Sequence, residues 1–262
     1  MRNPNYVIGR GKLFFTPFLP GTRTLVGGSR YFGNSPALSL SQDEEKVDHY
    51  NSDAGLKVKD ASATLQNDQT GSFSLDDISG PNLAMFFRGA IENGAVAAVN
   101  ADTTTVAVIL CTHVQLGLTD GNPIGARLVK GVTAKKGDEA VAAAGNFEVD
   151  SVTGRVYILP NASDIEEGDE IEFTYSTDAY DEEVVIAGGT LIEGRLDFLS
   201  DNAVGENRDY IWPYVQIRPD GDFSLKGDDW QTMEFNLEVL KLNDSTERQY
   251  IVKRPAAAPV AP

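Results

Sequence analysis

Alternation of polar and apolar residues is the feature of this sequence that most restricts its fold. Residues 170–175 read Glu-Ile-Glu-Phe-Thr-Tyr, and residues 233–239 read Met-Glu-Phe-Asn-Leu-Glu-Val. Successive side chains of a strand point to opposite faces, so this pattern predicts strands with one buried and one wet face. Residues 150–154 separate two further runs of this kind, and Gly154 is expected to take the left-handed conformation of a hairpin turn. The sequence therefore predicts a mainly β protein.

One segment has the features of a helix, over about 79–93. Ser79 suits the N-cap, and Pro81 falls in the first turn, where its missing N–H is not needed. Gly94 is a natural end for the helix. An apolar stripe at three-to-four spacing contains Leu83, Phe86, Phe87 and Ile91. A single helix of this kind is expected to cover an open face or end of a β-sandwich.

The 262 residues are enough for one large domain or two small ones. We expect a single domain over 1–254. Within it, the Gly- and Ala-rich stretch 112–146 has weaker periodicity, so that 112–180 is either an inserted β-module or a set of long loops. Residues 255–262 read Pro-Ala-Ala-Ala-Pro-Val-Ala-Pro, and we expect a flexible tail there, because prolines have no N–H for a sheet.

The charge is acidic and unevenly distributed. Lys and Arg number 22 against 39 Asp and Glu, which gives a net charge of −17 and excludes a basic nucleic-acid footprint. Residues 1–42 contain five basic residues and no acid, whereas 164–183 contain ten acids and no base. Such asymmetry fits a protein whose copies meet basic end to acidic face, and it is also compatible with an ordinary solvated surface.

Side chains that carry chemistry are scarce. The single cysteine, Cys111, excludes an internal disulfide and a Cys-based zinc site, and a buried apolar role is expected for it despite its spacing from His113. His49 is interpreted as an ordinary strand histidine. Acids at 164–183 and at Asp220, Asp222, Asp228 and Asp229 lack the regular ligand spacing of a calcium loop. The sequence thus predicts no enzyme, no cofactor and no metal.

Neither a membrane span nor a secretory leader is predicted. The longest apolar run, 106–111, is far too short to cross a bilayer, and residues 1–30 lack the charged-then-apolar order of a secretory signal.

Several motifs occur in an order that points to a family. A strand Gly-Arg-Gly-Lys-Leu-Phe-Phe over 9–15 is followed by Tyr-Phe-Gly-Asn-Ser-Pro-Ala-Leu-Ser-Leu over 31–40, which runs into the acidic stretch 43–50. A polar loop over 51–69, a strand over 71–75 and the helix from Ser79 come next. In this order the chain resembles the tail tube (major tail) proteins of long-tailed, non-contractile bacteriophages.

This resemblance implies a β-sandwich or barrel-like subunit with one short flanking helix. Six copies would form a ring, and stacked rings would form the hollow tail tube through which double-stranded DNA passes into the host. The partners implied are other copies of the chain, the tape measure, tail tip and terminator proteins, and passing DNA. The protein would be made in the bacterial cytoplasm, would reside in the virion tail and would not insert into a membrane.

Two sets of residues receive roles from this resemblance. The long loop after the acidic strand would reach toward the next ring, and residues 43–69 are the matching positions here. The charged residues proposed for this role are Asp43, Glu44, Glu45, Lys46, Lys57 and Lys59. An acidic lumen would repel DNA and let it slide, whereas a basic one would bind phosphates. Acids at alternating strand positions are candidates for that wall: Glu170, Glu172, Glu234 and Glu238.

Two other functions remain open. One is the tube of a contractile secretion system, whose cargo is protein. The other is a soluble β-sandwich module that binds carbohydrate or protein, which would need an exposed aromatic platform. Residues on one strand could supply it, or could instead pack in a core or subunit interface: Tyr210, Trp212 and Tyr214.

Overall fold

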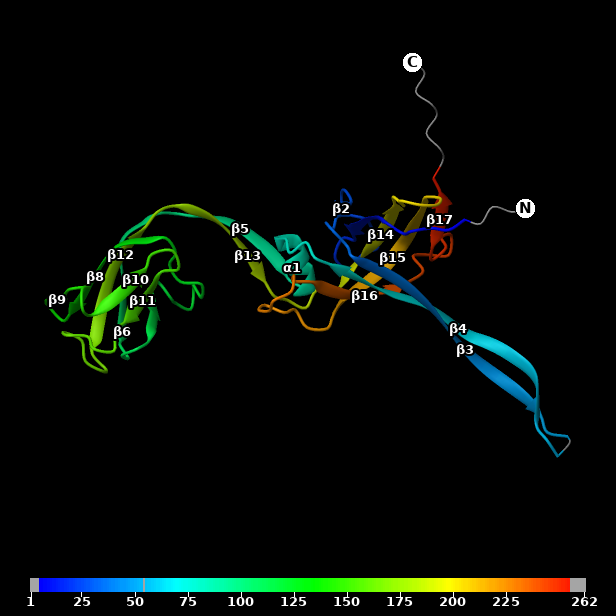
Figure 1. Cartoon of the computed structure of the whole chain (residues 1–262), viewed down its shortest axis with the longest axis horizontal. Helices are drawn as coiled ribbons and strands as arrows, with labels where there is room; N and C mark the ends of the chain where they lie inside the picture. Colours follow the sequence, from blue (N-terminus) through cyan, green and yellow to red (C-terminus); the bar gives the residue numbers. More distant parts are fainter. Residues whose placement is uncertain (1–4, 54, 255–262) are drawn as a thin grey trace, which may run out of the picture. The chain divides into compact units, whose positions relative to one another are not determined.

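The structure is a computed structural model that describes residues 5–53 and 55–254. The described residues form several antiparallel sheets and one α-helix, which confirms the prediction of a mainly β fold (Figure 1). The segment expected to be a flexible tail, 255–262, lies outside the described residues. The chain divides into two compact units: unit 1 comprises Met1–Glu92 and Val184–Pro262, and unit 2 comprises Asn93–Glu183.

Unit 1 is built on one antiparallel sheet of eight strands. Their order is β2, β1, β14, β15, β16, β4 and β3, and β17 pairs with the half of β15 that β16 leaves open. The strands are β1 (Gly11–Pro17), β2 (Arg30–Tyr31), β3 (Ala37–Asn51), β4 (Val58–Leu75), β14 (Ile192–Ser200), β15 (Arg208–Asp220), β16 (Met233–Val239) and β17 (Tyr250–Lys253).

The predicted alternation separates the two faces of this sheet. On β16, every second residue from Met233 to Val239 is buried, and the residues between them, Glu234 among them, are polar and wholly or partly exposed. The buried face forms one core with aromatic residues of neighbouring strands. In that core the rings of Phe73 and Phe235 stack with centroids 5.0 Å apart. At β16, one face of the sheet is therefore closed by the core, and the opposite face is polar.

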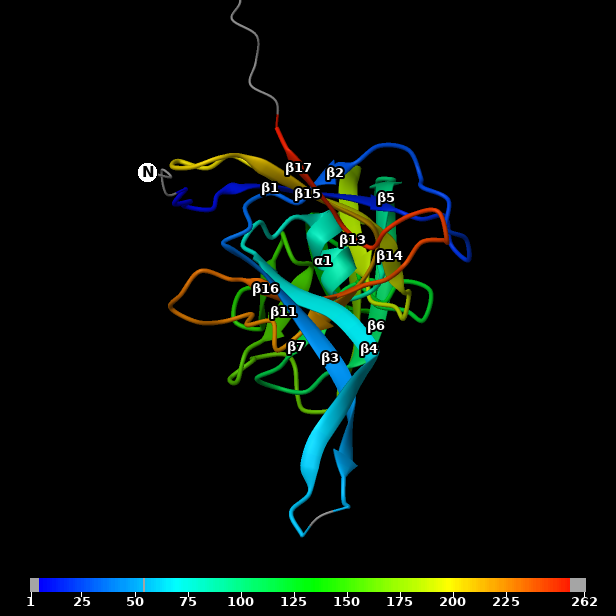
Figure 2. The ribbon, with the colours of Figure 1, turned by 90° about the vertical axis from the view of Figure 1, so that its right-hand side faces the viewer.

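Helix α1 (Gly80–Phe86) packs against the buried face of unit 1 (Figure 2). Ser79 occupies the N-cap position, although its side chain makes no capping bond, and Phe86 meets the ring of Phe235 edge-on at 5.8 Å. The fully buried Asn82 ties the helix to the sheet, because its Nδ2 donates to the carbonyl oxygen of Phe32 over 2.8 Å.

The helix is shorter than the predicted span of 79–93. It ends at Phe86, and Ile91 and Gly94 belong instead to strand β5 (Ala90–Val96), which pairs with β13 (Tyr180–Ile186). The backbone groups of this stretch bond across the two strands, so they are not available to a helix. Gly89 allows the change of direction, since a Cβ there would lie 1.7 Å from the carbonyl oxygen of Ile186.

Unit 2 contains a sheet of four strands and a sheet of three around a core of its own. The rings of Phe147 and Phe173, one from each sheet, meet edge-on with centroids 5.5 Å apart, so the two sheets pack face to face. The larger sheet has the order β6 (Val99–Ala107), β12 (Glu170–Thr177), β8 (Val129–Lys136), β9 (Glu139–Val141); the smaller has β10 (Phe147–Asp150), β11 (Arg155–Ile158), β7 (His113–Gln115).

The hairpin predicted around Gly154 is present between β10 and β11. Gly154 has a φ of 67°, and the side chain of Asp150 accepts a hydrogen bond from the Thr153 hydroxyl over 2.6 Å. The Gly- and Ala-rich stretch 112–146, whose periodicity is weak, contains three strands, β7, β8 and β9, separated by turns.

Candidate assembly surfaces

A long hairpin extends beyond the sheet of unit 1, and we call residues 43–68 the arm. Strand β16 pairs with β4 only from Leu75 to Gln69, and Gln69 pairs with Gln42 on β3. Beyond that pair, β3 and β4 continue as a ribbon of two strands (Figure 1). The prediction of a long polar loop over 51–69 was therefore wrong, because β4 already begins at Val58 and its backbone bonds to β3.

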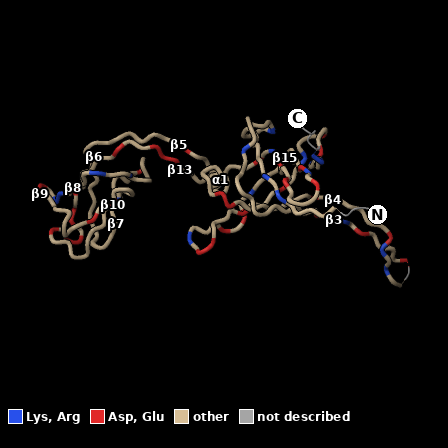
Figure 3. The backbone as a smooth tube through the Cα atoms, turned by 45° about the horizontal axis from the view of Figure 1, so that its top comes forward, with Lys and Arg blue, Asp and Glu red and all other residues tan. Residues whose placement is uncertain are grey.

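The charged residues expected to lie in an inter-ring loop are all on this arm, and all are exposed. Asp43, Glu44, Glu45 and Lys46 lie on β3, Lys59 lies on β4, and Lys57 lies in the turn between the strands. The part of the ribbon next to the sheet is acidic, with Asp43, Glu44 and Glu45 in succession, and the lysines follow further out (Figure 3).

Ion pairs within the arm occupy most of its lysines. Lys46 Nζ lies 2.7 Å from Glu44, and this hydrogen bond raises the pKa of the Lys46 amine. Lys59 Nζ lies 2.6 Å from Asp48, and its hydrogen bond lowers the pKa of that carboxyl, helped by the Ser62 hydroxyl. These pairs are exposed, so each adds little to the stability of the hairpin.

Apolar side chains of the arm are also exposed. Val47, Leu56 and Leu65 have exposed fractions of 52%, 77% and 65%. The ladder shifts register between Glu45 and Lys46, which leaves Leu65 without a partner on β3. A two-stranded ribbon without a third strand is marginally stable in water, and exposed apolar residues on it favour contact with another surface.

The four acids expected to line a lumen lie on two different units. Glu234 and Glu238 lie on the polar face of β16, where Glu238 is 3.4 Å from the guanidinium of Arg218. Glu170 and Glu172 lie on the outer face of β12 in unit 2, and Glu172 pairs across the strands with Lys135. Within each pair the two acids share one face of one strand.

The residues considered for catalysis do not form a site. Cys111 is exposed, contrary to the expected burial, and lies in a turn with a φ of 61°, outside the strand that begins at His113. The His113 ring packs on Tyr157 with centroids 4.7 Å apart. His49 Nδ1 lies 2.5 Å from Asp60 on the arm, and the described part of the chain contains no group of three or more acids, histidines or cysteines that could hold a metal.

The aromatic strand residues do not form an exposed platform. Trp212 and Tyr214 are buried in unit 1, and Tyr210 stacks on Trp212 with centroids 6.0 Å apart. Sequence reasoning passed over the other tryptophan, Trp230, whose side chain is 94% exposed. Its neighbours in the sequence, Asp228, Asp229 and Gln231, could have indicated this exposure. A single apolar residue among polar ones does not form the alternating pattern of a half-buried strand.

A family model matches residues 6–249, described as "Protein of unknown function UCP028589". The chain belongs to this family. No curated protein matches the chain. The matched residues of the UCP028589 family member include the arm and span both units. Among the described residues of this family member, no helix is long and apolar enough to cross a membrane.

Proposed function

We propose that this protein is a structural subunit that assembles into stacked hexameric rings. The stack forms a hollow tail tube in the virion, through which double-stranded DNA passes. The arm carries this proposal. The resemblance of the chain to tail tube proteins supplies the symmetry, the cargo and the further partners, which are the tape measure, tail tip and terminator proteins.

The arm supports assembly because, among its described residues, a single hydrogen bond links it to the rest of unit 1, from the guanidinium of Arg248 to the carbonyl oxygen of Asn67 at its base. The side chains of residues 43–53 and 55–68 are exposed, and only the neighbouring part of β4, from Gln69 onward, pairs with a third strand. A ribbon of this kind gains most when another molecule covers its apolar side chains, such as Leu65. In a stack of rings, the surface within reach of the arm belongs to the next ring.

Open sheet edges support closure of a ring. Strand β3 ends the sheet on one side, and within residues 5–53 and 55–254 β17 pairs only with β15. On β17, Tyr250, Ile251 and Val252 are all substantially exposed. Unpaired edges next to apolar side chains are templates for strand pairing, and head-to-tail pairing around a ring satisfies them.

Glu234 and Glu238 are the acids that we assign first to the lumen wall. On the same polar face, Glu234 lies opposite Asp220, and Glu238 lies opposite Gln216 and Thr70. This face has few bases to attract phosphate, with Arg218 the one that approaches Glu238. Glu170 and Glu172 remain the alternative pair, on unit 2.

Electron microscopy of the purified protein at rising concentration tests the proposal. We expect rings or tubes with an axial hole, and the double variant Val47→Ser with Leu65→Ser is expected to shorten the stacks. A matched control replaces two equally exposed apolar residues of unit 2, Leu118→Ser with Val152→Ser, and should leave tube length unchanged. Particles that stay compact monomers under all conditions would contradict the assembly.

Charge reversal tests the lumen. Tubes that carry Glu234→Lys and Glu238→Lys should retain double-stranded DNA and protect it from nuclease, because lysines on the wall neutralise phosphates. Wild-type tubes should leave the DNA unprotected. If tubes with Glu170→Lys and Glu172→Lys retain DNA instead, the lumen wall is formed by unit 2. If wild-type tubes retain DNA, the lumen is not acidic.

A further inference from the structure

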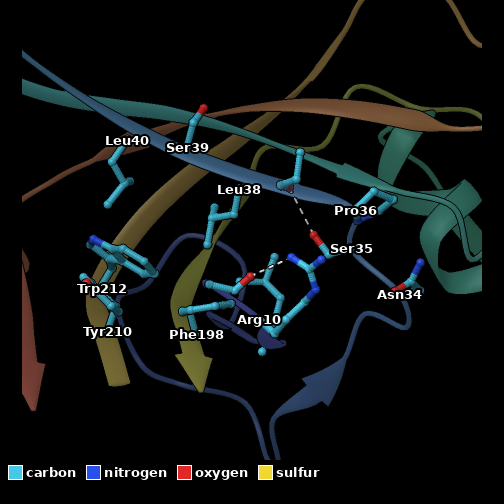
Figure 4. Close-up of a pocket in the computed structure, with 14 residues that line it drawn as sticks. Arg10, Asn34, Ser35, Pro36, Leu38, Ser39, Leu40, Phe198, Tyr210 and Trp212 are labelled. Atoms are coloured by element: carbon cyan, nitrogen blue, oxygen red, sulfur yellow. Dashed lines mark hydrogen bonds between the residues drawn. The ribbon is translucent and has the colours of Figure 1, made fainter. Parts of the chain in front are cut away.

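An apolar groove opens in unit 1 beside the free edge of β3 (Figure 4). Its volume is about 740 Å³, which is within the range of about 300–1,000 Å³ typical of binding sites. Its walls include Leu38 and Leu40 on β3, opposite Phe198, Tyr210 and Trp212, and the guanidinium of Arg10 lies between Phe198 and Ser35.

The groove has one feature that an occupant could complete. Arg10 is the one charged residue among those that line the groove, and it forms no ion pair with any described carboxylate. A complementary occupant is therefore apolar and flanked by negative charge.

The same unit carries a side chain with these properties. Trp230 lies in the connection between β15 and β16 and is almost completely exposed, at 94%. Asp228 and Asp229 precede it directly, and neither forms an ion pair with a described base. The connection also contains Asp222 and one base, Lys226.

We propose that Trp230 of one copy enters the groove of a neighbouring copy, with Asp228 and Asp229 against Arg10. This inference rests on the proposed self-assembly and names one of its contacts. Large aromatic side chains that fill a pocket, with charged pairs at the rim, are the usual centres of protein interfaces. A buried indole ring gains free energy by leaving water, and the pairing of charges selects the orientation.

The contact is heterologous, because the side chain and the groove are different surfaces of one chain. Each copy then offers a free groove to one neighbour and a free Trp230 to another. Such contacts close into a ring or continue as an open filament, depending on the rotation between copies. The contact therefore makes the assembly head-to-tail, with every copy in the same orientation relative to its neighbour.

Fluorescence of Trp230 reports directly on this contact, since the chain contains only two tryptophans. Trp212 lines the groove and is kept unchanged; because it is fully buried, the part of the emission that iodide quenches is that of Trp230. We expect its emission to be that of a water-exposed indole at low concentration and to shift to shorter wavelength as assemblies form. Assemblies in which Trp230 emission stays that of an exposed indole would overturn the inference.

Substitutions in the contact should raise the critical concentration for assembly, measured by sedimentation. Trp230→Ala and Arg10→Glu are each expected to raise it about tenfold or more. Leu225→Ala, in the same loop and also highly exposed, is the matched control and should change it less than about twofold. Adding Asp228→Arg and Asp229→Arg to Arg10→Glu should restore assembly, which general damage to the fold would not allow.

The remaining outcomes separate this inference from the proposed function. Tubes that form normally from Trp230→Ala would overturn the contact and leave the tube function standing. Oligomers with shielded Trp230 but without tubes would support the contact and count against the tube. A rise in critical concentration on deletion of 255–262, with none for Trp230→Ala, would identify that segment as the occupant and overturn the inference.

Discussion

Asp43 and Asp68 lie directly opposite each other, on β3 and β4, at the first pair beyond the sheet of unit 1. The preceding pair, Gln42 and Gln69, is uncharged, and Gln69 is buried. Like charges at directly opposed positions weaken a pair of strands. The arm is therefore separated from the sheet by an unfavourable pair, and its ribbon can open and bend at this point more easily than within the sheet.

We expect Asp43→Asn to stabilise the base of the arm. Removing one of the two charges relieves the repulsion and keeps the 2.5 Å hydrogen bond from Gln66 to Asp68. Amide hydrogen exchange in residues 43–68 should slow by a few-fold. Asp53→Asn, near the tip of the arm, is the control and should have no such effect, and unchanged exchange in Asp43→Asn would show that the pair is not repulsive.

Each unit has its own core, and we expect damage to one core to leave the other folded. Phe173 is fully buried in unit 2, and Phe173→Ala should lower the free energy of unfolding of that unit by about 3–5 kcal/mol. Phe235→Ala should do the same to unit 1. Denaturant titrations followed by hydrogen exchange should report the loss in the substituted unit, and equal losses in both would indicate one cooperative fold.

Gly154→Ala should destabilise unit 2 through a steric clash. A Cβ at Gly154 would lie 2.0 Å from the carbonyl oxygen of Ala126, and its φ of 67° already disfavours alanine. Gly137→Ala is the matched control, because its φ is 59° and nothing lies near its Cβ position. The melting temperature should fall much further for Gly154→Ala, and equal falls would assign the effect to the backbone conformation alone.

Unit 2 should lose stability in acid partly through Asp169. Its hydrogen bond with Lys136, at 2.5 Å, and a backbone N–H of Glu166 lower the pKa of the carboxyl below its ordinary value of 3.8. A lowered carboxyl pKa stabilises the folded state above the unfolded value, and this contribution disappears as the pH falls through the folded value. The melting temperature of Asp169→Asn should therefore change less with pH below about pH 4 than that of the wild type. Asp138→Asn, in the turn between β8 and β9, is the control and should behave like the wild type.

Local rules were enough where a few neighbouring residues decide the conformation. The alternation in 170–175 and 233–239 predicted β12 and β16 with the correct buried faces. Gly154 predicted the hairpin turn, and Pro81 predicted the start of the helix. In each case the local conformational preference of these residues agrees with the tertiary packing around them.

Long-range pairing decided the features that sequence reasoning missed. Residues 58–68 fall within the predicted polar loop, yet they form a strand because β3 lies beside them and pairs with their backbone groups. Ile91 fits the helical stripe, yet pairing between β5 and β13 takes its segment out of the helix.

The sequence by itself determined the mainly β class, the faces of the strands and the acidic charge, because side-chain period and composition are local properties. The tertiary structure decided that Trp212 is buried whereas Trp230 is exposed, and that a groove lies beside β3. Burial depends on which distant segments meet, and the same aromatic side chain is a core residue or an interface residue according to the surface left open around it.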